Sequence, residues 1–318
     1  MKQGVFYAGM AGAIWGAVIL APSLLPEFSP LLISCVRFAL YGALSLLIAL
    51  PFARRLFSRL GSGDLGLLVR LSLAGNLLYF ALLSTAVQLA GVTIASLING
   101  ILPIAITCLG RGHSDSLSMA QLKWPLLMVM AGILCINLDP AALSGVDSSE
   151  GERLLGIACA FAGVACWAWF ATRNAQYLKS SSFSSGEWAT LSGVVTGALA
   201  LVFGGLGWLL LPQAVPANLP AERWLEFFWV CLFLAVCGSW LAIGFWNAAT
   251  RRLPMSLGGQ LIVFETLFAC AYAFVIMQRL PGPLETLAIV LLTGGVAWAV
   301  SRHRRPVASA PAEGSLPG

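Results

Sequence analysis

The sequence Ser256–Met277, SLGGQLIVFETLFACAYAFVIM, is an apolar stretch long enough to cross a lipid bilayer as a helix. About 20 helical residues span roughly 30 Å of hydrocarbon. The one charged residue of this stretch is Glu265, which lies near its middle. A carboxylate at the bilayer centre costs roughly 2.5 kcal/mol or more. We therefore expect Glu265 to face a charged partner, a water-filled cavity or a substrate.

The composition places the whole chain in a membrane. Of its 318 residues, 59% are hydrophobic and only 10% are charged, whereas a soluble domain has about 25% charged residues. Helices are the expected spanning element, because a helix satisfies its backbone hydrogen bonds within one segment. The net charge of +5 does not indicate nucleic-acid binding, since the basic residues lie in short turns and form no basic face with interleaved aromatic residues.

The chain is predicted to be an all-α membrane protein with ten transmembrane helices. The expected spans are 4–24, 30–51, 66–89, 92–110, 120–139, 154–174, 186–211, 224–250, 255–277 and 283–301. Basic residues gather in the turns on one side, and the opposite turns hold only Arg153, Arg223 and Arg279. The positive-inside rule then places both termini in the cytoplasm. The tail 306–318 is rich in Ala, Pro, Ser and Gly and is predicted to be disordered.

Two short sequence matches indicate an internal repeat. Ala8–Ile19, AGMAGAIWGAVI, aligns with Ala160–Ala171, AFAGVACWAWFA, which places Trp15 on Trp167. Leu40–Leu46, LYGALSL, aligns with Val195–Leu201, VTGALAL, at nearly the same offset. Each match pairs a span with the one five later, and because five is odd the second half would be inserted the opposite way. The predicted units are two inverted five-helix repeats, 1–145 and 146–305, an architecture typical of secondary transporters.

This layout resembles the drug/metabolite transporter superfamily, in particular its EamA-type family. The resemblance lies in the two five-span halves, the Trp in the first and sixth spans, Pro103 in the fourth span and the short basic turns. It implies a carrier of small metabolites in the bacterial inner membrane, often an exporter of amino acids or related compounds. It also implies that spans one to four and six to nine surround the cavity. Thr266 stands near the position where the family often has a second proline, which puts a kink in the ninth span in doubt.

Arg37 and Glu265 are the central candidates for substrate binding. Glu265 is about 15 Å from the inner end of its span, and Arg37 is about 10 Å from the outer end of the second span. The two residues are therefore expected at nearly the same depth in the membrane. Three roles stay open. In the first, Arg37 binds a substrate carboxylate and Glu265 binds an ammonium group. In the second, the two residues form a structural ion pair. In the third, Glu265 carries protons, because burial disfavours its charged form.

Polar and aromatic residues within the spans complete the predicted site. Indole rings offer a surface for an ammonium or aromatic group, and intramembrane amides can bond a ligand or simply join helices. The predicted substrate-binding residues are Trp15, Arg37, Asn76, Tyr79, Asn99, Trp167, Asn247, Gln260 and Glu265.

The predicted function is an inner-membrane secondary transporter of an amino acid, amine or similar metabolite, working by alternating access, with export as the expected direction. The alternative is a membrane-embedded enzyme that modifies lipid, for which the acidic turn from Asp139 to Glu152 is the one candidate site. No cofactor or metal site is predicted: the eight Cys lie in apolar stretches without a CxxC pair. The expected partners are a small-molecule substrate and the bilayer, and a homodimer is left open.

Overall fold

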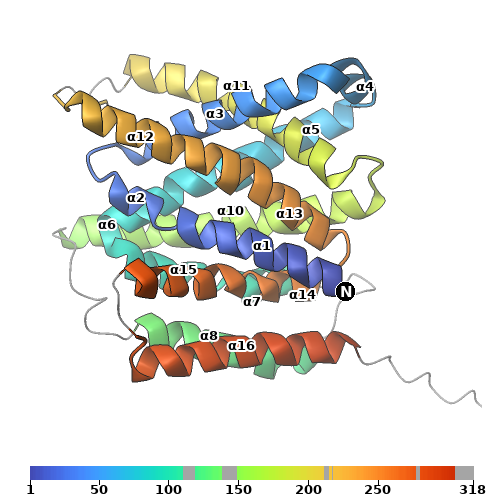
Figure 1. Ribbon diagram of the computed structural model, residues 1–318, viewed down its shortest axis with the longest axis vertical. Coiled ribbons are helices and arrows are strands. Elements are labelled where there is room, and N and C mark those ends of the chain that lie inside the picture. The colour runs from blue at the N-terminus through green and yellow to red at the C-terminus, as the bar shows by residue number, and fades with distance from the viewer. Residues whose placement is uncertain (110–118, 138–148, 211–214, 217, 277–279, 305–318) are drawn as a thin grey trace, which may run out of the picture.

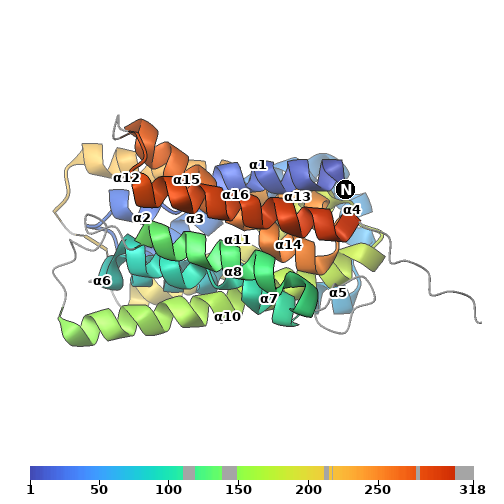
Figure 2. The same cartoon turned by 90° about the horizontal axis from the view of Figure 1, so that it is seen from below.

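The computed structural model describes the chain except residues 110–118, 138–148, 211–214, 217, 277–279 and 305–318. The predicted disordered tail therefore lies outside the described residues. Within the described residues the secondary structure is helical, without a strand. The long helices lie side by side with their axes along one common direction, as Figures 1 and 2 show from two sides. The prediction of an all-α protein is confirmed.

The first part of the chain forms helices at each predicted segment. They are α1 (Lys2–Val18), α2 (Ala21–Leu24), α3 (Pro30–Ala49), η1 (Leu50–Phe52), α4 (Ala53–Ser58), α5 (Ser62–Leu71), η2 (Ser72–Leu78), α6 (Tyr79–Asn99), α7 (Leu102–Leu109) and α8 (Met119–Asn137). Local sequence sets several of these limits. Ser29 caps α3 by accepting a hydrogen bond from the Leu32 N–H. Gly91 has a φ of 87° and divides α6 into two helical parts, because residues with a Cβ rarely adopt that backbone conformation.

The second part follows the same pattern of long and interrupted helices. They are α10 (Glu150–Ser180), α11 (Ser185–Leu210), α12 (Ala221–Phe233), η4 (Leu234–Leu241), α13 (Ala242–Thr250), α14 (Met255–Leu261), α15 (Val263–Ile276) and α16 (Pro283–Arg304). Ser149 and Glu152 form a capping box at the start of α10. Glu152, part of the turn considered for a lipid enzyme, thus serves as a helix cap.

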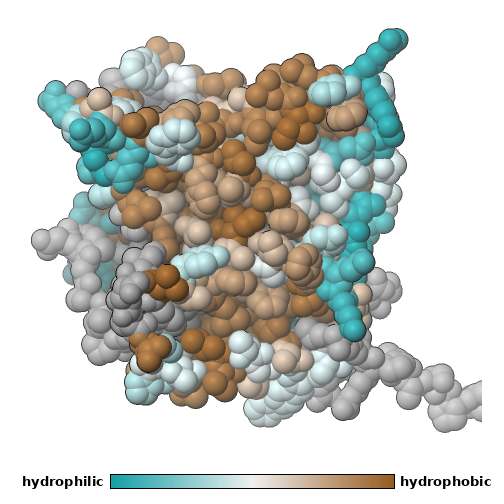
Figure 3. Space-filling model, in the orientation of Figure 1, coloured by the Kyte–Doolittle hydropathy of each residue, from teal (hydrophilic) through white to brown (hydrophobic). Residues whose placement is uncertain are grey.

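Five helical stretches are long and apolar enough to cross a membrane. They are Pro30–Ser58, Ser62–Gly91, Glu150–Ser180, Ser185–Leu210 and Ala221–Thr250. Shorter apolar helices cover Lys123–Cys135, Leu257–Ala269 and Thr286–Ala299. Large apolar side chains are exposed along the long helices, for example Leu209 and Leu210 at the end of α11. Figure 3 shows apolar residues over the middle of the visible face and hydrophilic residues toward its left and right edges, the distribution expected of a protein that spans a bilayer.

Several helical segments of the protein are interrupted or irregular. η2 and η4 are π-helical segments between α5 and α6 and between α12 and α13. The predicted span that contains Pro103 is divided into two helices: α6 ends at Asn99, and α7 begins at Leu102. α14 and α15 are likewise separated at Ile262, although no proline stands there. The ninth segment is thus divided without a proline, and the backbone at Ile262 keeps helical angles (φ −58°, ψ −26°).

Close helix packing depends on glycine at the contact between α3 and α11. A Cβ added at Gly42 would lie 2.5 Å from the Cα of Gly197, and one added at Gly197 would lie 2.4 Å from the Cα of Gly42. Small residues let helix backbones approach closely in membranes, where van der Waals contact drives association. The other main pairings are α6 with α10, α8 with α16, and α1 with both α13 and α15.

We predict that Gly197→Ala destabilises the protein, by about 1–3 kcal/mol, because the added methyl group forces the α3 and α11 backbones apart. Gly205→Ala, on the same helix, is the matched control, since a Cβ there would meet nothing within 4 Å. Thermal unfolding in detergent measures both variants. Equal melting temperatures for the two would show that the Gly42–Gly197 contact does not hold the helices together.

Candidate functional site

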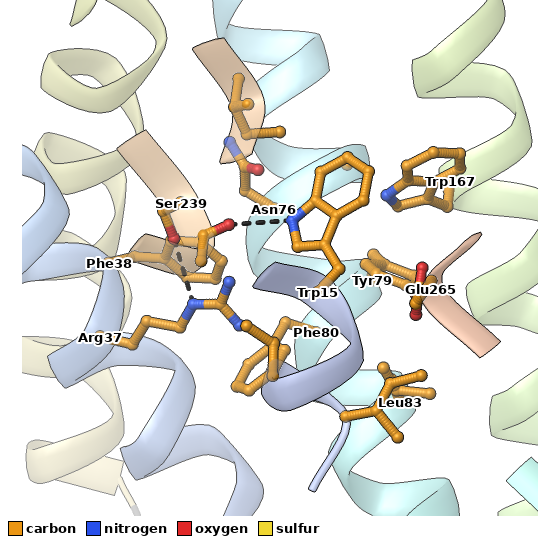
Figure 4. Close-up of a pocket in the computed structure, with 15 residues that line it drawn as sticks. Trp15, Arg37, Phe38, Asn76, Tyr79, Phe80, Leu83, Trp167, Ser239 and Glu265 are labelled. Carbon is orange, nitrogen blue, oxygen red and sulfur yellow. Dashed lines mark hydrogen bonds between the residues drawn. The ribbon is translucent and has the colours of Figure 1, made fainter. Parts of the chain in front are cut away.

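A cavity of about 50 Å³ lies in the interior of the helix bundle. Its walls come from α1, α3, η2, α6, α10, η4, α13 and α15, so segments from both parts of the chain meet there. Six of the nine residues predicted to bind substrate line this central cavity: Trp15, Arg37, Asn76, Tyr79, Trp167 and Glu265. Figure 4 shows their side chains around the cavity.

Arg37 brings a buried positive charge to the central cavity. Its side chain is 5% exposed, and its Nε donates a 3.2 Å hydrogen bond to the Ser239 hydroxyl. The guanidinium carbon lies 4.1 Å from the centre of the Phe80 ring and 4.9 Å from that of Phe38. No acidic side chain among the described residues pairs with Arg37. A buried charge without a counter-ion is costly, so its terminal nitrogens are suited to an anionic ligand.

Glu265 brings the opposite charge from α15, where it is the third residue of the helix. Carboxylates are favoured in the first helical turn because the backbone N–H groups there carry partial positive charge. The residue is 7% exposed. Its backbone is pressed against α1: a Cβ at Gly12 would lie 2.9 Å from the Glu265 nitrogen, and one at Gly16 would lie 2.9 Å from its carbonyl oxygen. The glycines thus allow the close approach that carries the carboxylate inward.

Arg37 and Glu265 do not form an ion pair within the described residues. Figure 4 places them on different sides of Trp15. The alternative in which the two charges form a structural ion pair is therefore not seen in this conformation. Both charges remain directed to the interior without a protein counter-ion in the described part of the chain.

Three tryptophans pack together at the edge of the central cavity. The Trp15 ring centre is 5.8 Å from that of Trp167 and 5.6 Å from that of Trp246, and the last two are 5.6 Å apart. The Trp15 indole N–H donates a 2.9 Å hydrogen bond to the carbonyl of Gly238. This carbonyl belongs to η4. The Trp15 ring is thereby held in one orientation as a rigid aromatic wall.

Asn76 and Tyr79 reach the central cavity while bonding to neighbouring helices. The Asn76 amide donates to the Thr196 hydroxyl at 2.9 Å, and the Tyr79 hydroxyl donates to the Asn99 side-chain oxygen at 3.3 Å. Asn99 itself lines a second, smaller cavity that also includes Glu265. The structure therefore brings Asn99 next to the central site without placing it in the same cavity.

Asn247 and Gln260 lie outside both of these cavities. The Asn247 side-chain oxygen accepts a 2.7 Å hydrogen bond from the Asn174 amide, and the Asn174 oxygen accepts one from the Trp188 indole at 2.8 Å. This network joins α10, α11 and α13. Gln260 is fully buried, and its amide nitrogen and oxygen have no hydrogen-bond partner in the described structure.

Sequence reasoning missed residues that position the two charges. Ser239 bonds Arg37, and its hydroxyl donates in turn to the Leu234 carbonyl at 3.0 Å within η4. A serine in an apolar segment gives little signal of such a role. Gly12 and Gly16 were detectable, because two glycines four residues apart are typical of close helix contacts in membranes.

The comparisons with known proteins agree with this architecture. Residues 2–138 match the EamA-like transporter family. The chain is 33% identical to the Inner membrane protein YtfF of Escherichia coli (strain K12) over 329 aligned positions, covering 98% of this chain and all of that protein. A solved crystal structure superposes with a TM-score of 0.73 at 18% identity, over 96% of this chain and 98% of that one, which shows a shared fold.

The match to the family and the full-length relative agree with the resemblance inferred from the repeat, the tryptophans and Pro103. The protein is a helical membrane protein, and it belongs to the EamA-like transporter family of the drug/metabolite transporter superfamily.

Proposed function

We propose that the protein is a secondary transporter that exports a small metabolite carrying both an anionic and a cationic group, or an amine. One observation carries the proposal: a buried cation and a buried carboxylate line one interior cavity, and neither has a counter-ion among the described residues. Ionisable groups inside a membrane protein are costly and typically mark a substrate or ion pathway. The transporter family of the chain supports the same reading.

Each residue of the central cavity has a chemical role in this proposal. The terminal nitrogens of Arg37 bind the anionic group of the substrate, since a guanidinium matches a carboxylate with two parallel hydrogen bonds. Glu265 binds the cationic group. The rings of Trp15, Tyr79 and Trp167 cover the apolar part of the substrate and add attraction for a cation above an indole face.

The proposed architecture is ten spans in two inverted repeats, 1–145 and 146–305. Two contacts support it. Trp15 packs on Trp167, and Gly42 packs on Gly197; in each pair the partners are the residues matched by the sequence repeat. Equivalent residues meet in this way where a two-fold axis passes between two copies of one unit. Figure 1 also shows α1 and α10, and likewise α3 and α11, running in opposite directions.

Alternating access is proposed to occur by opening contacts at the two ends of the bundle in turn. At one end Arg223 donates a 2.6 Å hydrogen bond to Glu27, and this bond holds the pKa of the Glu27 carboxyl below its ordinary value. Phe28 stacks on Phe227 beside it, with ring centres 4.3 Å apart. At the other end Arg59 pairs with Glu187 at 3.1 Å. Both contacts join the first part of the chain to the second.

The proposed location is the bacterial inner membrane, with both termini in the cytoplasm. The name of the E. coli relative supports the membrane, and the concentration of Lys and Arg in the turns on one side supports the orientation. In Figure 1 the N-terminus and the end of α16 lie at the same side of the bundle.

Counterflow in proteoliposomes tests the function. Vesicles preloaded with an unlabelled amino acid or amine are expected to accumulate the same labelled solute, in a panel of amino acids, amines and nucleobases. Exchange should be absent from vesicles without protein. If the folded protein exchanges no solute in the panel, the assignment of a zwitterionic or amine substrate is wrong.

The two charges are predicted to select opposite ends of the substrate. Arg37→Gln should weaken exchange of substrates with a carboxylate while sparing simple amines, and Glu265→Gln should do the reverse. A lost charged hydrogen bond costs about 1.5–3 kcal/mol, so the affinity for the affected class should fall about 10-fold to 100-fold. Equal losses of both classes in both variants would contradict the separate roles.

Replacing Arg37 is predicted to stabilise the substrate-free protein. Arg37→Met removes a buried charge that lacks a counter-ion and should raise the melting temperature, because the desolvation cost of the guanidinium disappears. The control is Arg59→Met, which removes a partly exposed ion pair with Glu187 and should leave stability equal or slightly lower. A large loss of stability in Arg37→Met would instead assign Arg37 a structural role.

A further inference from the structure

A second and smaller cavity, of about 10 Å³, is also lined by Glu265. It is formed where two helices are interrupted: between α6 and α7 at Gly100, and between α14 and α15 at Ile262. Its polar lining comes from Asn99, Glu265 and Thr266. Glu265 lines both this small cavity and the central cavity, so its two carboxylate oxygens can serve different ligands.

The polar side chains that line the small cavity make few hydrogen bonds within the described structure. Glu265 is buried, with only 7% of the residue exposed. Its carboxylate takes part in no hydrogen bond or ion pair among the described residues. The Asn99 oxygen accepts one hydrogen bond, from Tyr79, and an amide oxygen has a second lone pair. The Thr266 hydroxyl has no hydrogen bond within the described structure. Buried carboxylates without a partner are rare in folded proteins, and here the Glu265 carboxylate shares one space with an amide oxygen that has a free lone pair and with a threonine hydroxyl.

The charge around the cavity favours a cation. Glu265 supplies one negative charge, and α6 ends at Asn99, where the last backbone carbonyls carry partial negative charge. The first turn of α15 carries a partial positive charge, which is smaller than the full charge of the carboxylate. Irregular backbone between half-helices commonly holds coupling ions in membrane transporters. Carboxylate, amide and hydroxyl oxygens are hard ligands that suit hard metal ions rather than soft ones.

We propose that this small cavity binds one Na⁺ ion, coordinated by Glu265, Asn99 and Thr266. Glu265 is the one acidic side chain that lines the cavity, which is too little negative charge for Ca²⁺ or Mg²⁺ and favours a monovalent ion. The space, about 10 Å³, has room for one dehydrated ion and for no additional waters, since a single water needs about 10–15 Å³. The assignment deepens the proposed function by naming a coupling ion. The coupling role rests on the proposed function, whereas Na⁺ binding itself can be measured without a transported solute.

Equilibrium binding of ²²Na⁺ to the purified full-length protein tests the proposal. In choline chloride of fixed ionic strength at pH 8, we expect saturable binding of one ion per chain, displaced by unlabelled NaCl and not by an equal amount of KCl. Replacing choline by Na⁺ should also raise the melting temperature of the wild type, because a ligand of the folded state stabilises it. A folded wild-type protein that shows neither effect overturns the Na⁺ site.

Thr266 provides the discriminating variant. Thr266→Val keeps the shape of the side chain and removes its oxygen, so Na⁺ affinity should fall about tenfold, the equivalent of about 1.4 kcal/mol. Thr266→Ser should restore it. The control is Thr293→Val on α16, whose hydroxyl donates to the Ile289 carbonyl and lies outside the cavity. Equal Na⁺ affinity in Thr266→Val and wild type would overturn the coordination.

The outcome separates this proposal from the proposed function. Counterflow of a metabolite by a protein that binds no Na⁺ would retain the transporter and remove the ion site, leaving Glu265 to the substrate or to protons. Specific Na⁺ binding by a protein that exchanges no solute would retain the ion site and remove the substrate assignment.

Discussion

The close approach of α15 to α1 is the constraint on which the site depends. Gly12 and Gly16 leave room for the Glu265 backbone, and the first turn of α15 adds favourable partial charge around its side chain. The carboxylate is thereby buried within the bundle and avoids lipid, where its cost is greatest. Glycine spacing on one helix thus decides whether an acid on another can be kept inside the membrane.

Close packing and one hydrogen bond hold Arg37 in the interior without a counter-ion among the described residues. Its guanidinium lies against the Phe80 and Phe38 rings and bonds Ser239, while the Trp15 wall is fixed by the carbonyl of Gly238. Both Gly238 and Ser239 belong to the π-helical segment η4, and such segments are frequent at functional sites. The helix irregularity and the charged site are therefore parts of one arrangement, in which rigid packing offsets the cost of two unpaired charges.

Much of the fold could be predicted from the sequence, because hydropathy and segment length decide membrane helices. The repeat aligned Trp15 with Trp167 and Gly42 with Gly197 as equivalent positions, and the structure adds that both pairs are in contact. Of the site, Glu265 and Arg37 stood out because charge is rare in apolar segments. The repeat-based number of ten spans remains a prediction.

Other features depend on three-dimensional context that a single sequence does not encode locally. The break at Ile262 lacks a proline, and the π-helical segments carry no distinctive residue pattern. Asn247 looked like Asn76 in sequence, yet it bonds Asn174 away from the cavity. An amide within a span signals a polar contact, and only the helix packing decides whether that contact is a ligand or another helix.

The central claim is that Glu265 faces an aqueous cavity that opens to each side of the membrane in turn. The most direct measurement is the labelling of Glu265→Cys, in a variant with the native cysteines replaced, by a membrane-impermeant thiol reagent added to right-side-out or inside-out vesicles. The account predicts labelling from both sides, with each rate reduced when the protein is held in one conformation. Absence of labelling from either side in folded protein would contradict it.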